Sequence, residues 1–361
     1  MSVHEILIAV MAVFAALGAL DRIFGNRIGI GKEFENGILA MGALAMAMIG
    51  IICLAPVLAK LLKPVVVPVF NLLGADAAMF AGTILACDMG GGALAKELTA
   101  NPQAALLGGV LTGSMLGATV VFTIPVAMGI LKEEDRPFLA KGILCGVVTI
   151  PLGVLAGGLV AGFPVMMVVT NLVPIVLIAI LIVLGLWKWE KGMIRGFGIF
   201  GKGILAMITA GLAAAIVQEL TGFVIIPGLA PISDGFETVG EIAIVLAGAF
   251  PLVYAITRLL KKPLLKLGKV LRINDTAAAG LVASLANSIA TFDMLSGMDR
   301  RGKVVNVAFA VSAAFVFGDH MGFTAGFAPE MLPAVIVGKL VGGITAVAVA
   351  LWLTRKDGEN P

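Results

Sequence analysis

One stretch of the sequence constrains the fold more than any other, because it places a carboxylate inside an apolar run. Residues 73–95 read LGADAAMFAGTILACDMGGGALA, with Asp88 about halfway along and Gly90, Gly91 and Gly92 almost directly after it. A carboxylate near the bilayer centre costs roughly 2.5–3.5 kcal/mol on insertion scales. Each helical glycine costs roughly 1 kcal/mol relative to alanine. The combination predicts a broken helix that crosses a membrane and holds a buried charge, as in many transporter binding sites.

The composition predicts an all-α polytopic membrane protein. Of the 361 residues, 60% are hydrophobic and only 13% are charged, whereas a soluble domain has about 25% charged residues. The apolar runs lack the alternation of barrel strands, and about eleven of them (ten to twelve) approach the roughly 20 residues of a helical span. The segments are Val3–Leu20, Gly37–Leu62, Ala75–Ala95, Ala104–Leu131, Phe138–Ala161, Val165–Trp187, Gly203–Ile226, Ile242–Leu260, Thr276–Leu295, Val304–Phe317 and Met331–Leu353.

Several functional classes lack support in the sequence. Cys53, Cys87 and Cys145 lie in apolar runs without the spacing of metal ligands, so we expect reduced packing residues and no metal site. The sequence has no Walker loop and no nucleophile–base pair at a recognisable spacing, so we expect neither an enzyme nor a cofactor. The clustered cations lie in loops, where membrane topology explains them better than nucleic acid does.

The ends and loops predict a compartment and an orientation. The N-terminal MSVHEILIAV carries Glu5 where a signal peptide has a basic region. A cleaved signal peptide is therefore not expected, and the bacterial inner membrane is the natural compartment for a polytopic helical protein of this kind. If every segment crosses, the loops on the N-terminal side hold more Lys and Arg than the opposite loops, so we expect a cytoplasmic N-terminus.

An internal repeat runs through the chain. Asp76 and Asp88 follow a Lys-Pro pair in the first half of the chain. Asp275 and Asn287 follow a second Lys-Pro pair at the same two distances along the sequence. We therefore expect two related repeats of five segments, with broken helices near the midplane. The repeats are parallel if every segment crosses and inverted if one segment is re-entrant; the basic loops favour the parallel form. The predicted units are residues 1–161 (first repeat), 162–198 (linker helix) and 199–361 (second repeat and short tail).

Polar residues inside apolar segments mark the candidate site. Asp88 and its repeat mate Asn287, together with Ser288, would face each other at the helix breaks. Alternatively, Asp88 caps the helix that resumes after the glycines, and the other two residues hydrogen-bond between helices. Asp319 and His320 follow an apolar run in the second repeat only. This pair is either part of the site, where a histidine can change charge near physiological pH, or a solvated pair at a helix end.

Long strings of the sequence resemble a known family. FENGILAMGALAMAMIG, MFAGTILACDMGGGALAKEL, VFTIPVAMGI, AFAVSAAFVFGDHMGF and VGKLVGGITA are similar to the EutH family, the ethanolamine permeases of ethanolamine-utilisation operons. The resemblance extends from about Asp21 to Trp352. It implies a bacterial inner-membrane facilitator that imports ethanolamine for a cobalamin-dependent ammonia-lyase, often inside a microcompartment. The matching ACDMGG and FGDH strings support Asp88, Asp319 and His320 as binding residues.

Residue chemistry and resemblance agree on a cationic substrate. Protonated ethanolamine needs a carboxylate or an aromatic face for its ammonium and an amide or hydroxyl for its alcohol. We expect Asp88 or Asp319 to meet the ammonium. Asn287 or Ser288 would then meet the hydroxyl. The aromatic residues expected to close the cavity are Phe122, Phe292 and Phe317.

Two other functions stay open at this stage. One is a Na⁺- or H⁺-coupled symporter of another small polar solute. The other, less favoured, is a membrane scaffold that docks a microcompartment, since the polar tail after Leu353 is short. The expected partners are ethanolamine and the lipid bilayer; a homo-oligomer is an open alternative, and nucleic acid is not expected.

Overall fold

The computed structural model describes residues 2–355, apart from the side chains of residues 260–262, 264, 265 and 267, and all its regular elements there are helical. This confirms the predicted all-helical class. The last residues of the predicted tail, 356–361, lie outside the described part. Within that part, seven helices are long and apolar enough to cross a membrane. They are Val3–Ile23, Ile30–Leu72, Pro102–Ile130, Glu133–Val160, Val165–Thr221, Ile232–Leu259 and Pro329–Leu353.

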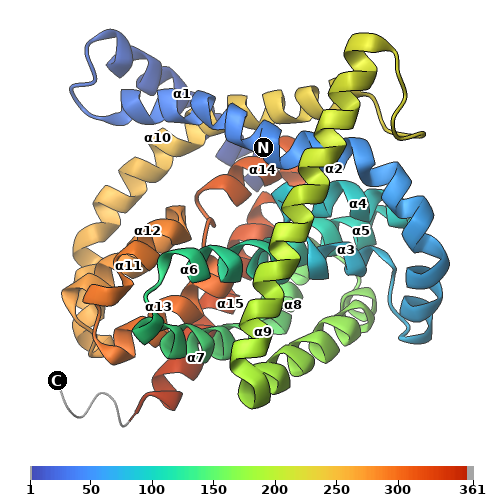
Figure 1. The fold of residues 1–361 in the computed structure, drawn as a ribbon. Coiled ribbons are helices and arrows are strands. Elements are labelled where there is room, and N and C mark those ends of the chain that lie inside the picture. The colour runs from blue at the N-terminus through green and yellow to red at the C-terminus, as the bar shows by residue number, and fades with distance from the viewer. Residues whose placement is uncertain (1, 356–361) are drawn as a thin grey trace.

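Long helices surround short, broken ones (Figure 1). The long helices α1 (Val3–Ile23), α2 (Ile30–Leu72), α9 (Val165–Thr221) and α10 (Ile232–Leu271) lie at the periphery. Trp189 has non-helical φ and ψ of −145° and 51°, which divides α9 into two arms. The remaining elements are α3 (Ala78–Ile84), η1 (Cys87–Met89), α4 (Gly91–Leu98), α5 (Pro102–Ala105), η2 (Leu106–Gly117), η3 (Thr119–Thr123), α6 (Ile124–Ile130), η4 (Glu133–Asp135), α7 (Arg136–Val147), α8 (Ile150–Val160), α11 (Asp275–Ala286), α12 (Ser288–Asp293), η5 (Leu295–Gly297), α13 (Arg300–Ala313), α14 (Asp319–Phe327), η6 (Pro329–Met331) and α15 (Leu332–Leu353).

The segment around Asp88 folds back on itself and does not cross. Helices α3 and α4 form a hairpin, and its two ends are tied by a hydrogen bond of 2.7 Å that Thr99 Oγ1 donates to Asp76 Oδ2. At the tip, Gly90 has a φ of 92°, a left-handed conformation that glycine adopts without steric cost. The expectation that this run spans the membrane is therefore wrong. The glycine turn reverses the chain halfway.

The segment around Asn287 is also a hairpin. Helices α11 and α12 lie side by side, because Thr291 Oγ1 donates a 3.0 Å hydrogen bond to the carbonyl oxygen of Gly280. Asn274 Nδ2 at the entry donates to the carbonyl oxygen of Gly297 at the exit, at 3.0 Å. The predicted span Thr276–Leu295 is thus corrected in the same way as the first.

An unwound stretch between α13 and α14 holds the second hairpin. The N–H groups of Phe315 and Phe317 donate to the carbonyl oxygens of Ser284 and Leu285, at 3.0 and 2.9 Å. Backbone groups away from water need such partners, because each unpaired one costs several kcal/mol in an apolar environment. The hydrogen bonds therefore make a non-helical segment tolerable at this depth.

Close backbone approach at the hairpins predicts two sensitive glycines. A methyl group on Gly318 would overlap the carbonyl oxygen of Ala286, and one on Gly117 would overlap that of Leu85. Gly117→Ala and Gly318→Ala should each lower the midpoint of thermal unfolding in detergent, because overpacking costs roughly 1–3 kcal/mol. The control Gly42→Ala has nothing within 4 Å of its added carbon and should be neutral or stabilising. Equal midpoints for all variants would contradict the close packing.

Candidate functional site

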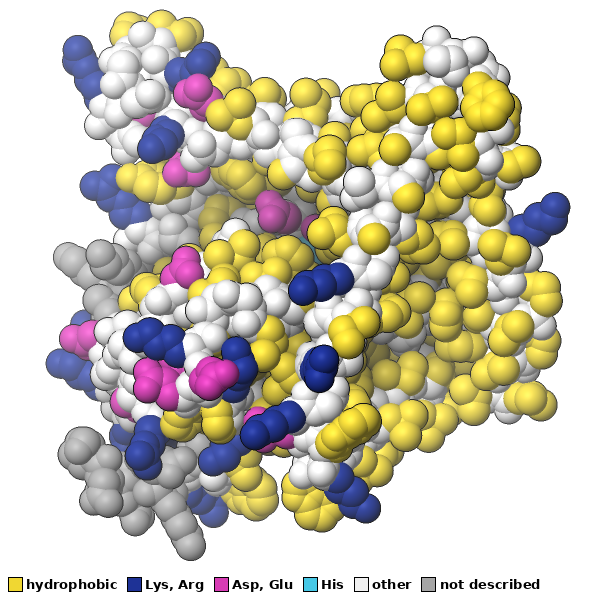
Figure 2. All heavy atoms as spheres, viewed as in Figure 1, with side chains coloured by type: hydrophobic (Ala, Val, Ile, Leu, Met, Phe, Trp, Pro, Cys, Tyr) yellow, Lys and Arg dark blue, Asp and Glu magenta, His cyan; other side chains and the backbone are white. Residues whose placement is uncertain are grey.

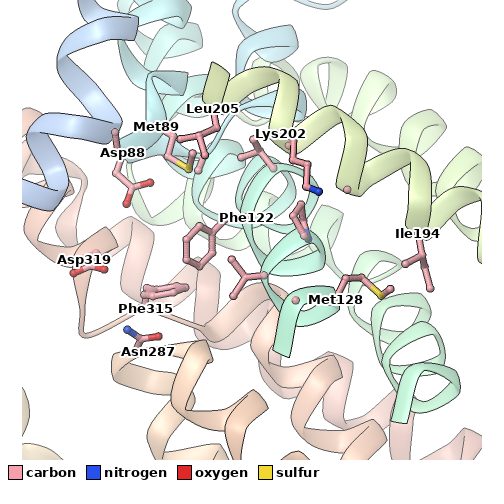
Figure 3. Close-up of a pocket in the computed structure, with 18 of the residues that line it drawn as sticks. Asp88, Met89, Phe122, Met128, Ile194, Lys202, Leu205, Asn287, Phe315 and Asp319 are labelled. Carbon is pink, nitrogen blue, oxygen red and sulfur yellow. The ribbon is translucent and has the colours of Figure 1, made fainter. Parts of the chain in front are cut away.

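A cavity of about 1490 Å³ extends from the surface to the tips of both hairpins. Figure 2 shows the hollow on this face, with acidic side chains inside it. Its floor contains Asp88, Asn287, Asp319 and His320, so residues far apart in the sequence meet at one place (Figure 3). The charged residues around its mouth are Glu133, Arg136, Glu190, Lys191, Arg195 and Lys202.

Helix breaks position the polar side chains of the floor. Asp88 lies in the short 3₁₀ turn η1 at the tip of the first hairpin, just before Gly90, and its side chain is 15% exposed. It does not cap α4, whose N-cap is Gly90 without a side-chain hydrogen bond, and Gly91 and Gly92 form the first turn. The capping alternative for Asp88 is therefore wrong. Its carboxylate instead faces the cavity (Figure 3).

Asn287 caps a helix and also lines the floor of the cavity. Its Oδ1 accepts the N–H of Ile289 at 2.7 Å, which caps the start of α12. This local bond fixes the side chain at the hairpin tip, and the residue still lines the cavity. The neighbouring Ser288 is 0% exposed, does not line the cavity, and has an Oγ without a hydrogen-bond partner among the described residues.

The aromatic lining differs from the expectation in two residues. Phe122 lines the cavity as expected, whereas Phe292 is buried in the core and Phe317 is not among the lining residues. Phe315 lines the cavity instead, and its ring lies 5.6 Å from that of Phe122 and 5.1 Å from that of His320, centroid to centroid. Phe315 has a φ of 62°. Such a left-handed turn at a non-glycine residue leaves no clear trace in the sequence.

A buried lysine lies behind the floor, and it escaped the sequence interpretation. Lys339, in the middle of α15, is 0% exposed, and its Nζ lies 3.0 Å from Nδ1 of His320. On the other side of the ring, Nε2 lies 3.8 Å from Oδ1 of Asp88. The signal that could have found it is a single lysine within the apolar run VIVGKLVGG. The two nitrogens of one imidazole thus face charges of opposite sign.

Three potential metal ligands also meet here. One ligand atom each from Cys87, Asp88 and His320 lie within 4.8 Å of one another. A histidine that binds a metal ordinarily donates its second N–H to a carboxylate or a carbonyl. Here the second nitrogen faces the Lys339 ammonium, which opposes a metal ion on the first. The arrangement fits charged groups on either side of one imidazole better than it fits a metal centre.

An aromatic cluster lies further along α14, after the two floor residues at the start of that helix. Phe323 and Phe327 stack with ring centroids 4.8 Å apart, and Lys96 Nζ lies 3.7 Å from the centroid of the Phe327 ring. None of these three residues lines the cavity. This cluster is therefore not part of the cavity lining.

Comparisons with known proteins identify a family that the chain matches over almost its whole length. A family model described as ethanolamine utilisation protein, EutH, matches residues 3–353. The chain is 60% identical to a probable ethanolamine permease EutH of Listeria monocytogenes, over 99% of this chain and 95% of the relative. It is 49% identical to the protein of that name from Escherichia coli, over 99% and 97%, and 51% identical to the uncharacterized protein YxeR of Bacillus subtilis, over 98% and 96%. No solved structure matches the chain.

Proposed function

The chain belongs to the EutH family of ethanolamine utilisation proteins, and we propose that it is an inner-membrane facilitator that imports ethanolamine in its ammonium form. The observation that carries the proposal is the cavity floor, where Asp88 and Asp319 lie beside Asn287. Two carboxylates suit a small cation, and an amide suits an alcohol. The names of the relatives from Listeria monocytogenes and Escherichia coli support the same substrate.

The binding mode follows from the positions of the floor residues. The ammonium would lie between the carboxylates of Asp88 and Asp319, under the rings of Phe122 and Phe315. An ammonium near an aromatic face gains roughly 0.5–2 kcal/mol, most when it is desolvated. The hydroxyl would accept from the Nδ2 of Asn287, whose Oδ1 is occupied by the cap of α12. Binding through helix breaks is the usual plan of secondary transporters.

Removing either floor carboxylate should weaken ethanolamine uptake. A lost hydrogen bond to a charged group costs roughly 1.5–3 kcal/mol, so we expect Asp88→Asn and Asp319→Asn to raise the half-saturation concentration roughly tenfold to a hundredfold. The measurement is uptake of radiolabelled ethanolamine into proteoliposomes. Asp293→Asn is the matched control, because this carboxylate is exposed and lies outside the cavity. Unchanged uptake in both floor variants would exclude the assignment.

Counterflow distinguishes facilitation from coupled transport. Liposomes loaded with unlabelled ethanolamine should accumulate the labelled substrate without any Na⁺ or H⁺ gradient, at two pH values, if the protein is a facilitator. Net accumulation that requires an imposed gradient would instead support the symporter alternative.

The two hairpins support an inverted repeat. Each hairpin returns to the side from which it enters, as the hydrogen bonds between their ends indicate. If the other apolar segments each cross, and α9 counts as two arms, five crossings, α1 included, precede the second arm of α9. An odd number inverts the second half relative to the first. We infer that residues 1–161 and 199–353 are inverted repeats joined by a linker helix.

The same count reverses the orientation expected from the sequence. With the hairpins re-entrant, only Lys60, Lys63 and Lys96 remain on the side of the N-terminus. Apart from the buried Lys339, the other Lys and Arg residues up to Arg355 are assigned to the opposite side. So strong an asymmetry favours a cytoplasmic location for that opposite side. The N-terminus would then be outside the cell. The cavity, whose mouth carries Arg and Lys residues of that side, would open to the cytoplasm.

Cysteine labelling tests this orientation. Ser2→Cys should react with a membrane-impermeant maleimide in right-side-out vesicles, whereas Lys191→Cys at the cavity mouth should react only after permeabilisation. The native cysteines are all buried and provide a low background. The reverse pattern would contradict both the orientation and the cytoplasmic opening.

A further inference from the structure

Lys339 is the most deeply buried cation of the described chain, and the transport proposal leaves it unused. Its Nζ donates a 2.6 Å hydrogen bond to the carbonyl oxygen of Ser114 in η2 and lies 3.0 Å from Nδ1 of His320 in α14. Three elements, α15, η2 and α14, therefore converge on one ammonium group. A buried charge is costly unless it is paired, so the compensation for this one must come from its surroundings.

The Lys339 ammonium meets the neutral ring of His320, and Asp88 lies on the far side of that ring. A lysine ammonium has only donors, so Nδ1 of His320 accepts and the ring proton is carried on Nε2. That nitrogen lies 3.8 Å from Oδ1 of Asp88. Among the described side chains, no carboxylate oxygen lies within the 4.0 Å of a direct ion pair with Lys339. The imidazole therefore separates the lysine from the cavity while it aligns a donor with the carboxylate.

Lys339 does not line the cavity, so it does not compete with a ligand for space. Its charge nevertheless acts on the floor, because the interior around it is apolar and screens charge far less than water does. With the imidazole neutral, Asp88, Asp319 and Lys339 together have a net charge of about minus one. A single monovalent cation in the cavity neutralises that charge.

We propose that Lys339 is the resident cation of the site, and that it sets the floor charge so that the cavity accepts one monovalent cation. This inference rests on the proposed function and deepens it, because it names the charge class of the substrate. If a neutral residue replaced Lys339, no positive charge would offset the carboxylates of Asp88 and Asp319. Such a floor would favour a dication, or a second cation beside the first. Lys339 is thus a positioning residue that acts through His320.

A matched pair of ligands tests the charge count. At neutral pH 3-amino-1-propanol is a monocation and 1,3-diaminopropane is a dication of nearly the same length. The readout is the thermal stabilisation of the purified protein by each amine, which does not depend on transport. The wild type should prefer the amino alcohol. Lys339→Gln should reverse the preference, with a change of roughly tenfold or more in the ratio of the two apparent affinities. Lys339→Arg, which keeps the charge, should retain the wild-type preference.

A double variant separates charge from structure. Lys339→Gln combined with Asp319→Asn removes one charge of each sign and should restore the preference for the monocation, even if the single variant is too unstable to purify. Equal loss of affinity for both amines in Lys339→Gln, or a double variant that prefers the dication, would overturn the proposal. Stabilisation of the wild type by neither amine would overturn it together with the proposed function. Failure of ethanolamine uptake alone, with the charge preference intact, would overturn only the proposed function.

Discussion

The fold depends on hydrogen bonds that pair the backbone N–H and carbonyl groups buried away from water. Both hairpin tips and the unwound stretch before α14 interrupt helices in the interior, where an unpaired backbone group is costly. In the second hairpin, the N–H groups of Phe315 and Phe317 donate hydrogen bonds to carbonyl oxygens near the end of α11. Close approach at Gly117 and Gly318 lets each tip pack against a neighbouring helix backbone. Because the interruptions are buried by the long outer helices, polar side chains can gather between them.

Charge balance is the second constraint, and it connects the fold to the substrate. Asp88 and Asp319 reach the floor from different halves of the chain, and each is positioned by a helix break. Lys339 lies behind them, on the far side of the His320 ring, and its charge is opposite to theirs. A floor that is slightly negative, lined by Phe122 and Phe315, suits a small organic cation better than an anion or a neutral solute. This agrees with the names of the relatives, which are probable ethanolamine permeases.

The sequence predicted the membrane class and most of the floor, and physical reasons explain what it missed. Asp88 and Asn287 stand out because polar groups in apolar runs are costly and therefore conspicuous. The hairpins were missed because two half-length helices have the same hydropathy as one full span. The expected cytoplasmic N-terminus also rested on counting both hairpins as full spans. Lys339 was missed because a lysine in an apolar helix can extend toward the interface. Its partners, Ser114 and His320, are near it only in the folded chain.

The central claim is that the floor carboxylates recognise the charge of ethanolamine. Equilibrium binding of radiolabelled ethanolamine to the purified protein tests it most directly, with ethylene glycol and ethylammonium as competitors. Ethylene glycol keeps the hydroxyl but replaces the ammonium by a second hydroxyl, whereas ethylammonium keeps the charge and lacks the hydroxyl. The account predicts that ethylammonium displaces ethanolamine with reduced affinity and that ethylene glycol does not displace it. Displacement by ethylene glycol at concentrations similar to those of ethanolamine would contradict the account.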